Sequence, residues 1–138
     1  MTQPAAPLDD LLDLMPFART TGVQLAEADA SLVRGSLAWA PELCTAMGVL
    51  HGGALMTLAD SVGAVCAFLN LPPGATTSTV ESKTNFFRAV RSGTLHAVAR
   101  PLHTGGSIVV VQTELSDDDG RAVGMTVQSQ AVRGGDRG

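Results

Sequence analysis

The chain has 138 residues, of which 45% are hydrophobic and 16% are charged, with a formal net charge of −4. This length fits one domain with a substantial buried core, and the mild acidity excludes the basic surface that nucleic-acid binding requires. The first residues lack the basic and apolar pattern of a signal peptide, so we expect a cytoplasmic protein with no nucleic-acid or membrane partner.

Two isolated cysteines, Cys44 and Cys66, have neither metal-binding nor CxxC spacing. This usage fits a reducing compartment and predicts free thiols and no bound metal. We interpret residues 1–138 as a single domain, with loose ends over residues 1–6 and 134–138.

The first part of the chain predicts one short helix, two strands and a loop. Residues 8–15 alternate acids and leucines at helical spacing, and Pro16 is expected to close this amphipathic helix. Residues 23–30 and 31–40 have the composition of two strands joined by a tight turn. Residues 41–50 are then expected to form a loop.

Residues 51–70 predict a long central helix. They contain no Lys, Arg, Glu or Pro, and their one formal charge is Asp60. At about 100° per residue, large apolar side chains fall on one face of this helix: Leu55, Leu58, Ala59, Val62, Val65, Cys66 and Leu69. The opposite face carries mostly small residues: Gly53, Met56, Thr57, Asp60, Gly63, Ala64 and Ala67.

A helix that is apolar or small all round is expected to be buried. We therefore predict a sheet against its large-residue face and another helix against its small-residue face. The length also fits a membrane span, but Asp60 near the centre and the glycine-rich start argue against one.

The rest of the chain predicts four strands, at residues 76–88, 93–103, 107–116 and 122–133. The run Ile108-Val109-Val110-Val111 suits a central strand, and the segment 117–120, Asp-Asp-Asp-Gly, suits a turn. Antiparallel strands around one segregated helix are typical of an α+β fold.

Asp60 is the first candidate functional residue. A buried ionised carboxylate is costly unless it is paired, and no cation lies three or four residues away on the helix. Asp60 is either a structural residue bonded to the backbone or to a hydroxyl such as that of Thr57, or a general base or nucleophile in a poorly hydrated cleft.

The tripeptide His51-Gly52-Gly53 is the second candidate. Glycines that open a helix leave backbone N–H groups facing outward at the positive end of the helix dipole, where a phosphate or a developing oxyanion binds. The alternative is that the glycines only permit a tight turn and that His51 caps or packs against the helix.

The spacing of the two candidates predicts a dimer. Gly52 and Asp60 are eight residues apart, or about 12 Å along a helix axis, so one small reacting group cannot contact both. If two copies of the helix pack antiparallel about a two-fold axis, Gly52 of one lies beside Asp60 of the other. This arrangement predicts two equivalent sites, each built from both chains.

Other polar residues are weaker candidates. His96 and His103 are interpreted as ordinary surface or core histidines, and Ser61 lacks the G-x-S-x-G context of a nucleophile. Arg88 and Arg91 are either solvated edge charges or a phosphate clamp.

The pattern Gly48-x-x-His51-Gly52-Gly53, then Leu58-x-Asp60, followed by four strands, resembles the hotdog-fold acyl-CoA thioesterases. The likeness covers roughly residues 22–132 and is greatest to the PaaI-type branch, named for phenylacetic acid degradation. The resemblance implies a hotdog fold, with a long central helix wrapped by a six-stranded antiparallel sheet. It also implies homodimers with active sites at the interface, usually paired into homotetramers.

The resemblance also implies roles for individual residues. Asp60 would act as nucleophile or as base for water, and the backbone N–H of Gly52 would bind the thioester oxygen. His51 would position the thioester, and Thr79 would hold the water. Thr45 stands where the family usually has Asn or Gln.

Substrate contacts follow from the same resemblance. Gly106 stands where the family often has a basic residue near the CoA phosphates, so those contacts would fall to Arg88, Arg91 or backbone N–H groups. Gly53 would contribute at the helix start. The acyl group would meet an apolar lining: Met47, Met56, Phe68, Leu69 and Phe86.

The sequence therefore predicts an acyl-CoA thioesterase without metal or redox cofactor, acting on an aryl or medium-chain acyl-CoA. Two alternatives remain open. One is a hotdog hydratase or dehydratase that pairs a catalytic histidine with an acid, and the other is a non-catalytic acyl-CoA-binding protein.

Overall fold

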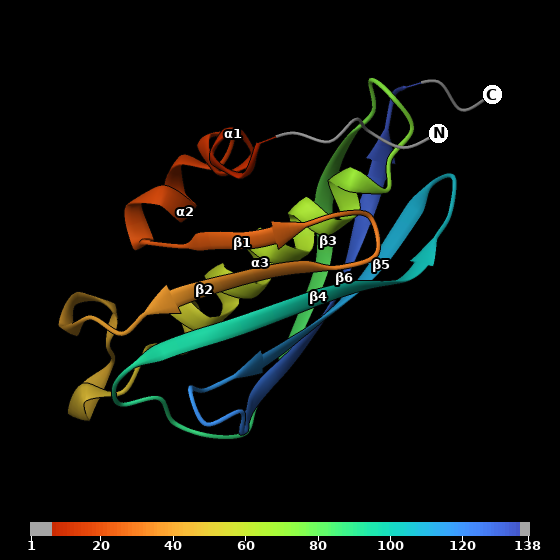
Figure 1. The fold of residues 1–138 in the computed structure, drawn as a ribbon. Helices are drawn as coiled ribbons and strands as arrows, with labels where there is room; N and C mark the ends of the chain where they lie inside the picture. Colours follow the sequence, from red (N-terminus) through yellow and green to blue (C-terminus); the bar gives the residue numbers. More distant parts are fainter. Residues whose placement is uncertain (1–6, 136–138) are drawn as a thin grey trace.

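The computed structural model describes residues 7–135 and has a six-stranded antiparallel sheet curved around one long helix, α3 (Gly52–Leu69) (Figure 1). The strands lie in the order β1-β2-β4-β5-β6-β3. Their bounds are β1 Gln24–Ala28, β2 Val33–Ala38, β3 Thr76–Phe86, β4 Thr94–Thr104, β5 Ile108–Ser116 and β6 Ala122–Arg133. The predicted α+β architecture and the central position of β5 are confirmed. Residues 1–6 and 136–138 of the expected loose ends lie outside the described residues.

The N-terminal part differs from the expectation. The predicted helix over residues 8–15 is α1 (Leu8–Asp13), but Pro16 does not simply end it, because Pro16 begins a second helix, α2 (Pro16–Thr21). Proline suits the first helical position, since its φ is already helical and its missing N–H would have no partner there. The expected loop over residues 41–50 contains two short 3₁₀ helices, η1 (Pro41–Leu43) and η2 (Ala46–Gly48).

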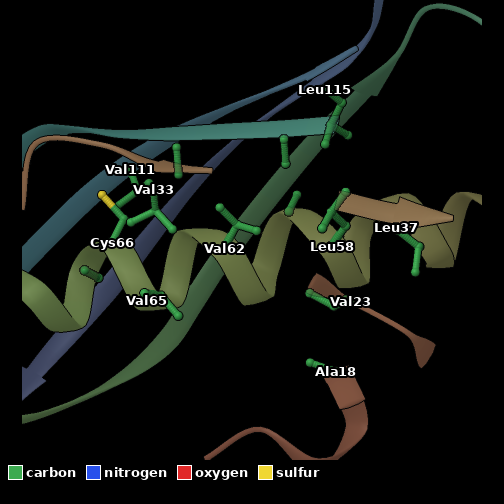
Figure 2. Packing of buried hydrophobic residues seen from close by; sticks show 14 of the residues in the cluster. Ala18, Val23, Val33, Leu37, Leu58, Val62, Val65, Cys66, Val111 and Leu115 are labelled. Carbon is green, nitrogen blue, oxygen red and sulfur yellow. The ribbon is translucent and has the colours of Figure 1, made fainter. Parts of the chain in front are cut away.

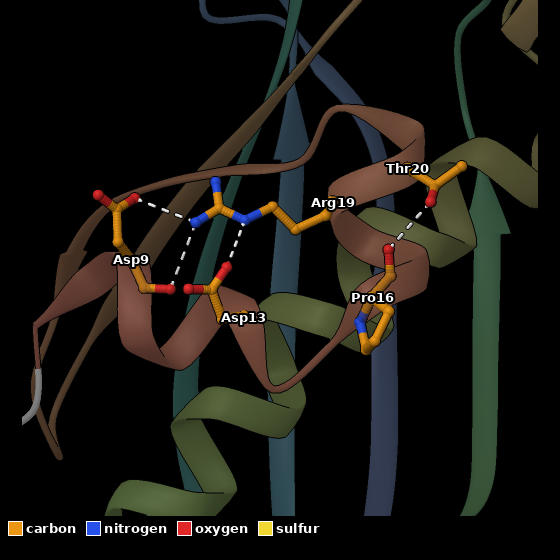
Figure 3. A network of polar contacts seen from close by, with 5 residues as sticks. All are labelled: Asp9, Asp13, Pro16, Arg19 and Thr20. Atoms are coloured by element: carbon orange, nitrogen blue, oxygen red, sulfur yellow. Dashed lines mark hydrogen bonds and ion pairs between the residues drawn. The ribbon is translucent and has the colours of Figure 1, made fainter.

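Arg19 of α2 ties the two short helices together (Figure 3). Its Nε lies 2.8 Å from Asp13 Oδ1, and its Nη2 lies 3.5 Å from Asp9 Oδ1. These ion pairs are exposed and each contributes little stability. The buried residues Leu11, Leu12 and Ala18 attach the helix pair to the core.

The core lies between α3 and the concave face of the sheet (Figure 2). Every residue of the predicted large-residue face of α3 is buried. The helix approaches β2 so closely that a Cβ atom on Gly35 would lie 2.6 Å from Val62 Cγ2. Both cysteines are free thiols, and burial raises the pKa of Cys66 to about 12.

The small-residue face of α3 is divided between core and surface. Gly63 and Ala67 are buried in the fold, whereas Met56 and Asp60 are exposed. The expectation that α3 is buried all round is therefore wrong for a single chain, because α1, α2 and the sheet leave Met56 and Asp60 accessible to solvent. The helix has the length and hydropathy of a membrane span, but 61% of it is buried inside the fold.

We predict that Leu58→Ala lowers the free energy of unfolding by about 2–5 kcal/mol, because Leu58 is fully buried and its truncation leaves a cavity. Urea denaturation measures this loss. Leu102→Ala is the matched control, since Leu102 is 56% exposed and should change stability by less than about 0.5 kcal/mol. Equal losses in the two variants would contradict the assignment of the core.

Candidate active site

Asp60 lies on the uncovered side of α3, and the same oxygen of its carboxylate accepts two hydrogen bonds. Thr79 Oγ1 on β3 donates to Asp60 Oδ1 at 3.0 Å, and Gln128 Nε2 on β6 donates to it at 3.1 Å. Thr57, the hydroxyl suggested for the structural alternative, instead donates to the Gly53 carbonyl at 2.8 Å. The hydroxyl that bonds Asp60 therefore comes from the sheet and not from the helix.

A second glutamine extends this network along the inner face of the sheet. Gln130 Nε2 donates to Thr79 Oγ1 at 2.7 Å, and Thr77 Oγ1 donates to Gln130 Oε1 at 3.1 Å. Since Thr79 accepts from Gln130, its own hydrogen is directed at Asp60. The network is a chain of donors that ends on the Asp60 carboxylate.

Gln128 and Gln130 were not among the predicted site residues, although both are 1% exposed. The available signal was their alternation with Thr126 on β6, because residues two apart on a strand share one face. Polar side chains on the strand face that meets a central helix must find partners there. That requirement points to the single charge on α3.

A β-bulge in β3 determines which of its side chains face this site. Thr79 pairs with Gln130 and Glu81 pairs with Ser129, which leaves Val80 as an extra residue in the strand. The extra residue changes which side chains face α3. As a result Thr79 reaches Asp60, while Ser82 lines the hollow beside Asp60.

The start of α3 combines a cap with one available donor. His51 Nδ1 accepts a hydrogen bond from the Gly53 N–H at 2.7 Å, so His51 caps the helix and the Gly53 N–H is not available to a ligand. Within residues 7–135, the Gly52 N–H has no hydrogen-bond acceptor. Because Nδ1 is an acceptor, the neutral His51 ring carries its proton on Nε2.

Asp60 and Gly52 line separate hollows of the single chain. The hollow beside Asp60 has a volume of about 400 Å³ and is formed by α2, α3, β3 and Met15, the residue that precedes α2. Its lining residues are Met15, Phe17, Ala18, Met56, Thr57, Asp60, Ser61 and Ser82. The hollow beside Gly52 has about 410 Å³ and contains Thr45, Phe86 and Arg88. The two share no residue. This separation agrees with the spacing argument that one chain does not supply both groups to one ligand.

The other predicted substrate contacts are distributed more widely. Phe68 lines a third hollow between α1, α3 and β3, whereas Leu69 is buried in the core and lines none of these hollows. Met47 is 90% exposed. Arg91 lies beside the acidic turn after β5, and Gly106 lies in the turn between β4 and β5.

The remaining polar candidates have local partners. His96 Nε2 lies 2.7 Å from Asp118 Oδ1, and this hydrogen bond, with one from the Thr94 N–H, lowers the pKa of Asp118. The Ser61 hydroxyl donates to the Thr57 carbonyl. Across residues 7–135, no three His, Cys, Asp or Glu side chains are grouped in a way that could hold a metal ion.

Comparison with known proteins assigns the chain to a family. In Escherichia coli, 1,4-dihydroxy-2-naphthoyl-CoA hydrolase is 38% identical over 74 residues, which is 54% of each chain. The proofreading thioesterase EntH of Cronobacter turicensis is 32% identical over 87 residues, 63% of this chain and 64% of that protein. The chain thus spans about half to two thirds of the length of these relatives.

A solved structure extends the likeness to nearly the whole chain. A mutant of thioesterase PA1618 from Pseudomonas aeruginosa has a TM-score of 0.89 and 27% identity, with 96% of this chain and 97% of that chain covered. Residues 47–123, more than half of the chain, match the Thioesterase superfamily and include His51, Gly52, Asp60 and Thr79. With this match and the hotdog architecture described above, the chain belongs to the thioesterase superfamily.

Proposed function

We propose that the protein is an acyl-CoA thioesterase that hydrolyses its substrate to a free acid and CoA. The observation that carries the proposal is the Asp60 carboxylate, which is held on Oδ1 by two donors and opens into a hollow of about 400 Å³. Relatives named as a CoA-thioester hydrolase and a proofreading thioesterase support the reaction class.

The chemistry requires a polarised carbonyl and a positioned carboxylate. The Gly52 N–H and the His51 Nε2–H would donate to the thioester oxygen as it gains negative charge, assisted by the dipole of α3. Asp60 would then either attack the carbonyl carbon or take a proton from an attacking water. In the nucleophilic route, the C–S bond breaks as an acyl–Asp60 anhydride forms, the CoA thiolate leaves, and water then cleaves the anhydride to give the free acid and restore Asp60. In the general-base route, Asp60 takes a proton from water as its oxygen adds to the carbonyl carbon, the C–S bond breaks, and that proton passes to the departing thiolate.

The state of His51 favours hydrolysis over dehydration. A dehydratase needs a histidine nitrogen that can accept a proton from the substrate, but His51 Nδ1 is occupied by the Gly53 N–H. Its other nitrogen carries a hydrogen and is suited to donate. His51 is therefore better suited to hold a carbonyl oxygen than to act as a base.

The active site is proposed to form between two chains of a homodimer. β3 is an edge strand of eleven residues that exposes Val80 and Phe86, and Phe87, directly after the strand, is exposed as well. A long edge strand presents unpaired backbone N–H and C=O groups with which another strand can pair. Pairing of two β3 edges about a two-fold axis would bring the Asp60 side of each α3 toward the partner's Gly52 hollow and complete two sites. Two such dimers would form the proposed homotetramer.

The acyl group is proposed to be aryl or medium-chain, as in the PaaI-type branch. Met56 is beside Asp60, Phe86 is beside Gly52, and Phe68 lies farther along α3, so apolar side chains accompany both halves of the site. Arg88 shares the Gly52 hollow with Thr45 and is the proposed contact for a CoA phosphate. Arg91, Gly106 and Met47 line neither of these two hollows, so they would contact the substrate only at the site shared with the partner subunit or after a change in loop conformation. A cytoplasmic location remains part of the proposal.

We predict that Asp60→Asn lowers kcat/KM for thioester hydrolysis by roughly 10²- to 10⁴-fold, because the amide can neither attack nor accept the proton. Thiol release across a panel of phenylacyl- and alkyl-CoA esters measures the change. Asp10→Asn is the control, since this exposed aspartate of α1 lies away from the hollow. Near-full hydrolysis by Asp60→Asn would refute the assignment.

The same assay separates the two alternatives. A new enoyl absorbance without thiol release would identify a hydratase or dehydratase, and binding of CoA esters with neither product would identify a non-catalytic binder. Either result with the wild-type protein would overturn the proposed reaction.

We also predict that Val80→Lys dissociates the dimer and abolishes most hydrolysis, because it places like charges across the two-fold axis of the β3 edge. Light scattering measures the mass and circular dichroism checks the fold. Leu102→Lys introduces the same charge on β4, at a residue with a similar exposed fraction of 56% against 57% for Val80. A wild-type monomer with full hydrolysis would contradict the shared site.

A further inference from the structure

Gln128 has a buried side-chain amide whose nitrogen donates a hydrogen bond while its oxygen accepts none. It is 1% exposed, and its Nε2 donates to Asp60 Oδ1 at 3.1 Å. Its Oε1 has no hydrogen-bond donor in the described part of the chain. Gln130, two residues along β6, uses both ends of its amide, with Thr79 and Thr77.

The charge of Asp60 explains this orientation. If the Gln128 amide were rotated by half a turn, its oxygen would face the carboxylate, and two acceptors would oppose each other without a hydrogen between them. With the NH₂ group toward Asp60, the bond is charge-assisted and stronger than a neutral one. The oxygen is then left without a partner, which destabilises the fold.

Gly63 makes the space that this arrangement needs. A Cβ atom at position 63 would overlap Gln128 Oε1, so only glycine lets the amide lie between β6 and α3. Gly63 follows Asp60 by three residues and lies near the same face of the helix. The close approach of α3 to β6 therefore serves the contact between Gln128 and Asp60.

We propose that Gln128 is a positioning residue that holds Asp60 Oδ1 and so presents the other carboxylate oxygen, Oδ2, to the substrate. The inference rests on the proposed thioesterase function. Thr79 and Gln128 donate to the same oxygen from two strands, β3 and β6, which restricts the Asp60 side chain to one rotamer. An apolar residue at position 128 would remove the unpaired amide oxygen but would leave the Asp60 carboxylate with a single hydrogen-bond donor, Thr79.

The consequence is that glutamine at position 128 lowers the stability of the fold, through its unpaired oxygen, while it supports catalysis by Asp60. A residue whose role is only structural loses stability when its hydrogen bond is removed, whereas Gln128 should not, because its replacement also removes an unpaired buried oxygen. Stabilising substitutions at functional sites commonly reduce activity in this way. The two effects can be measured separately.

The test is Gln128→Met, which keeps the length of the side chain and removes both polar atoms. We expect kcat for the best CoA ester to fall roughly 10- to 100-fold, because a small misplacement of a reacting group has effects of this size. KM should stay within about two-fold, and the urea midpoint should equal or exceed that of the wild type, by the argument on the unpaired oxygen.

Thr113→Val is the matched control. Thr113 is a fully buried residue of β5, and its hydroxyl also has no hydrogen-bond partner among the described residues. Its replacement removes an orphaned polar atom without touching Asp60. We expect the same or a higher urea midpoint and an unchanged kcat.

The outcomes separate this inference from the proposed function. If the wild type releases no thiol, or Asp60→Asn is fully active, the proposed function fails. If hydrolysis depends on Asp60 but Gln128→Met keeps the wild-type kcat, the positioning role alone is overturned. A loss of kcat with a lowered urea midpoint would assign Gln128 a structural role and would also overturn it.

A measurement that leaves Gln128 in place covers the case in which Gln128→Met does not fold. The side-chain amide protons of Gln128 should shift in the nuclear magnetic resonance spectrum of Asp60→Asn, because that variant loses the charged acceptor. Amide protons of Gln130 should move less, since Gln130 contacts Asp60 only through Thr79. An unchanged Gln128 resonance would overturn the proposal.

Discussion

The close contact between α3 and the concave face of the sheet is the constraint on which the rest of the structure depends. A curved sheet of six strands has one concave face against which a helix can pack. The side chains between the helix and the sheet must fill this space without voids or overlap. Glycine lies where the two come nearest, at Gly35 beneath Val62 and at Gly63 above Gln128. The same contact that builds the core therefore determines which polar groups can reach the helix.

The elements of the fold were predictable because their signals are local. The apolar positions of α3 recur at helical spacing, and the segment Pro72-Pro73-Gly74, which disfavours a helix, follows shortly after its end, so the helix and its buried face follow from neighbouring residues. The error at Pro16 has the same origin, because proline marks both the end of one helix and the first turn of another. The local sequence alone does not distinguish a proline that ends a helix from one that begins the next.

The surroundings of Asp60 were less predictable because they depend on contacts between distant residues. We expect Asp60 on a helix buried all round, but it is exposed in the single chain, and it bonds to Thr79 and Gln128 and not to the nearby hydroxyl of Thr57. The irregularity at Val80 changes which β3 residues face α3, and an alternation pattern without it selects the wrong side chains. Knowledge of the register of β3 against β6 was needed.

The start and the middle of α3 present their functional groups in different directions, and this supports the proposal that a second chain completes the site. At the start, the His51 cap leaves the Gly52 N–H open beside Phe86 and Arg88. In the middle, the donors to Asp60 come from beneath the helix, so Oδ1 is anchored inward and the rest of the carboxylate faces outward. Two groups on one straight helix, each facing its own hollow, cannot turn toward each other without breaking the contact with the sheet. In the proposed dimer, a second helix would bring its own start to the exposed carboxylate, and the packed core that separates the two groups within a chain would hold both in place.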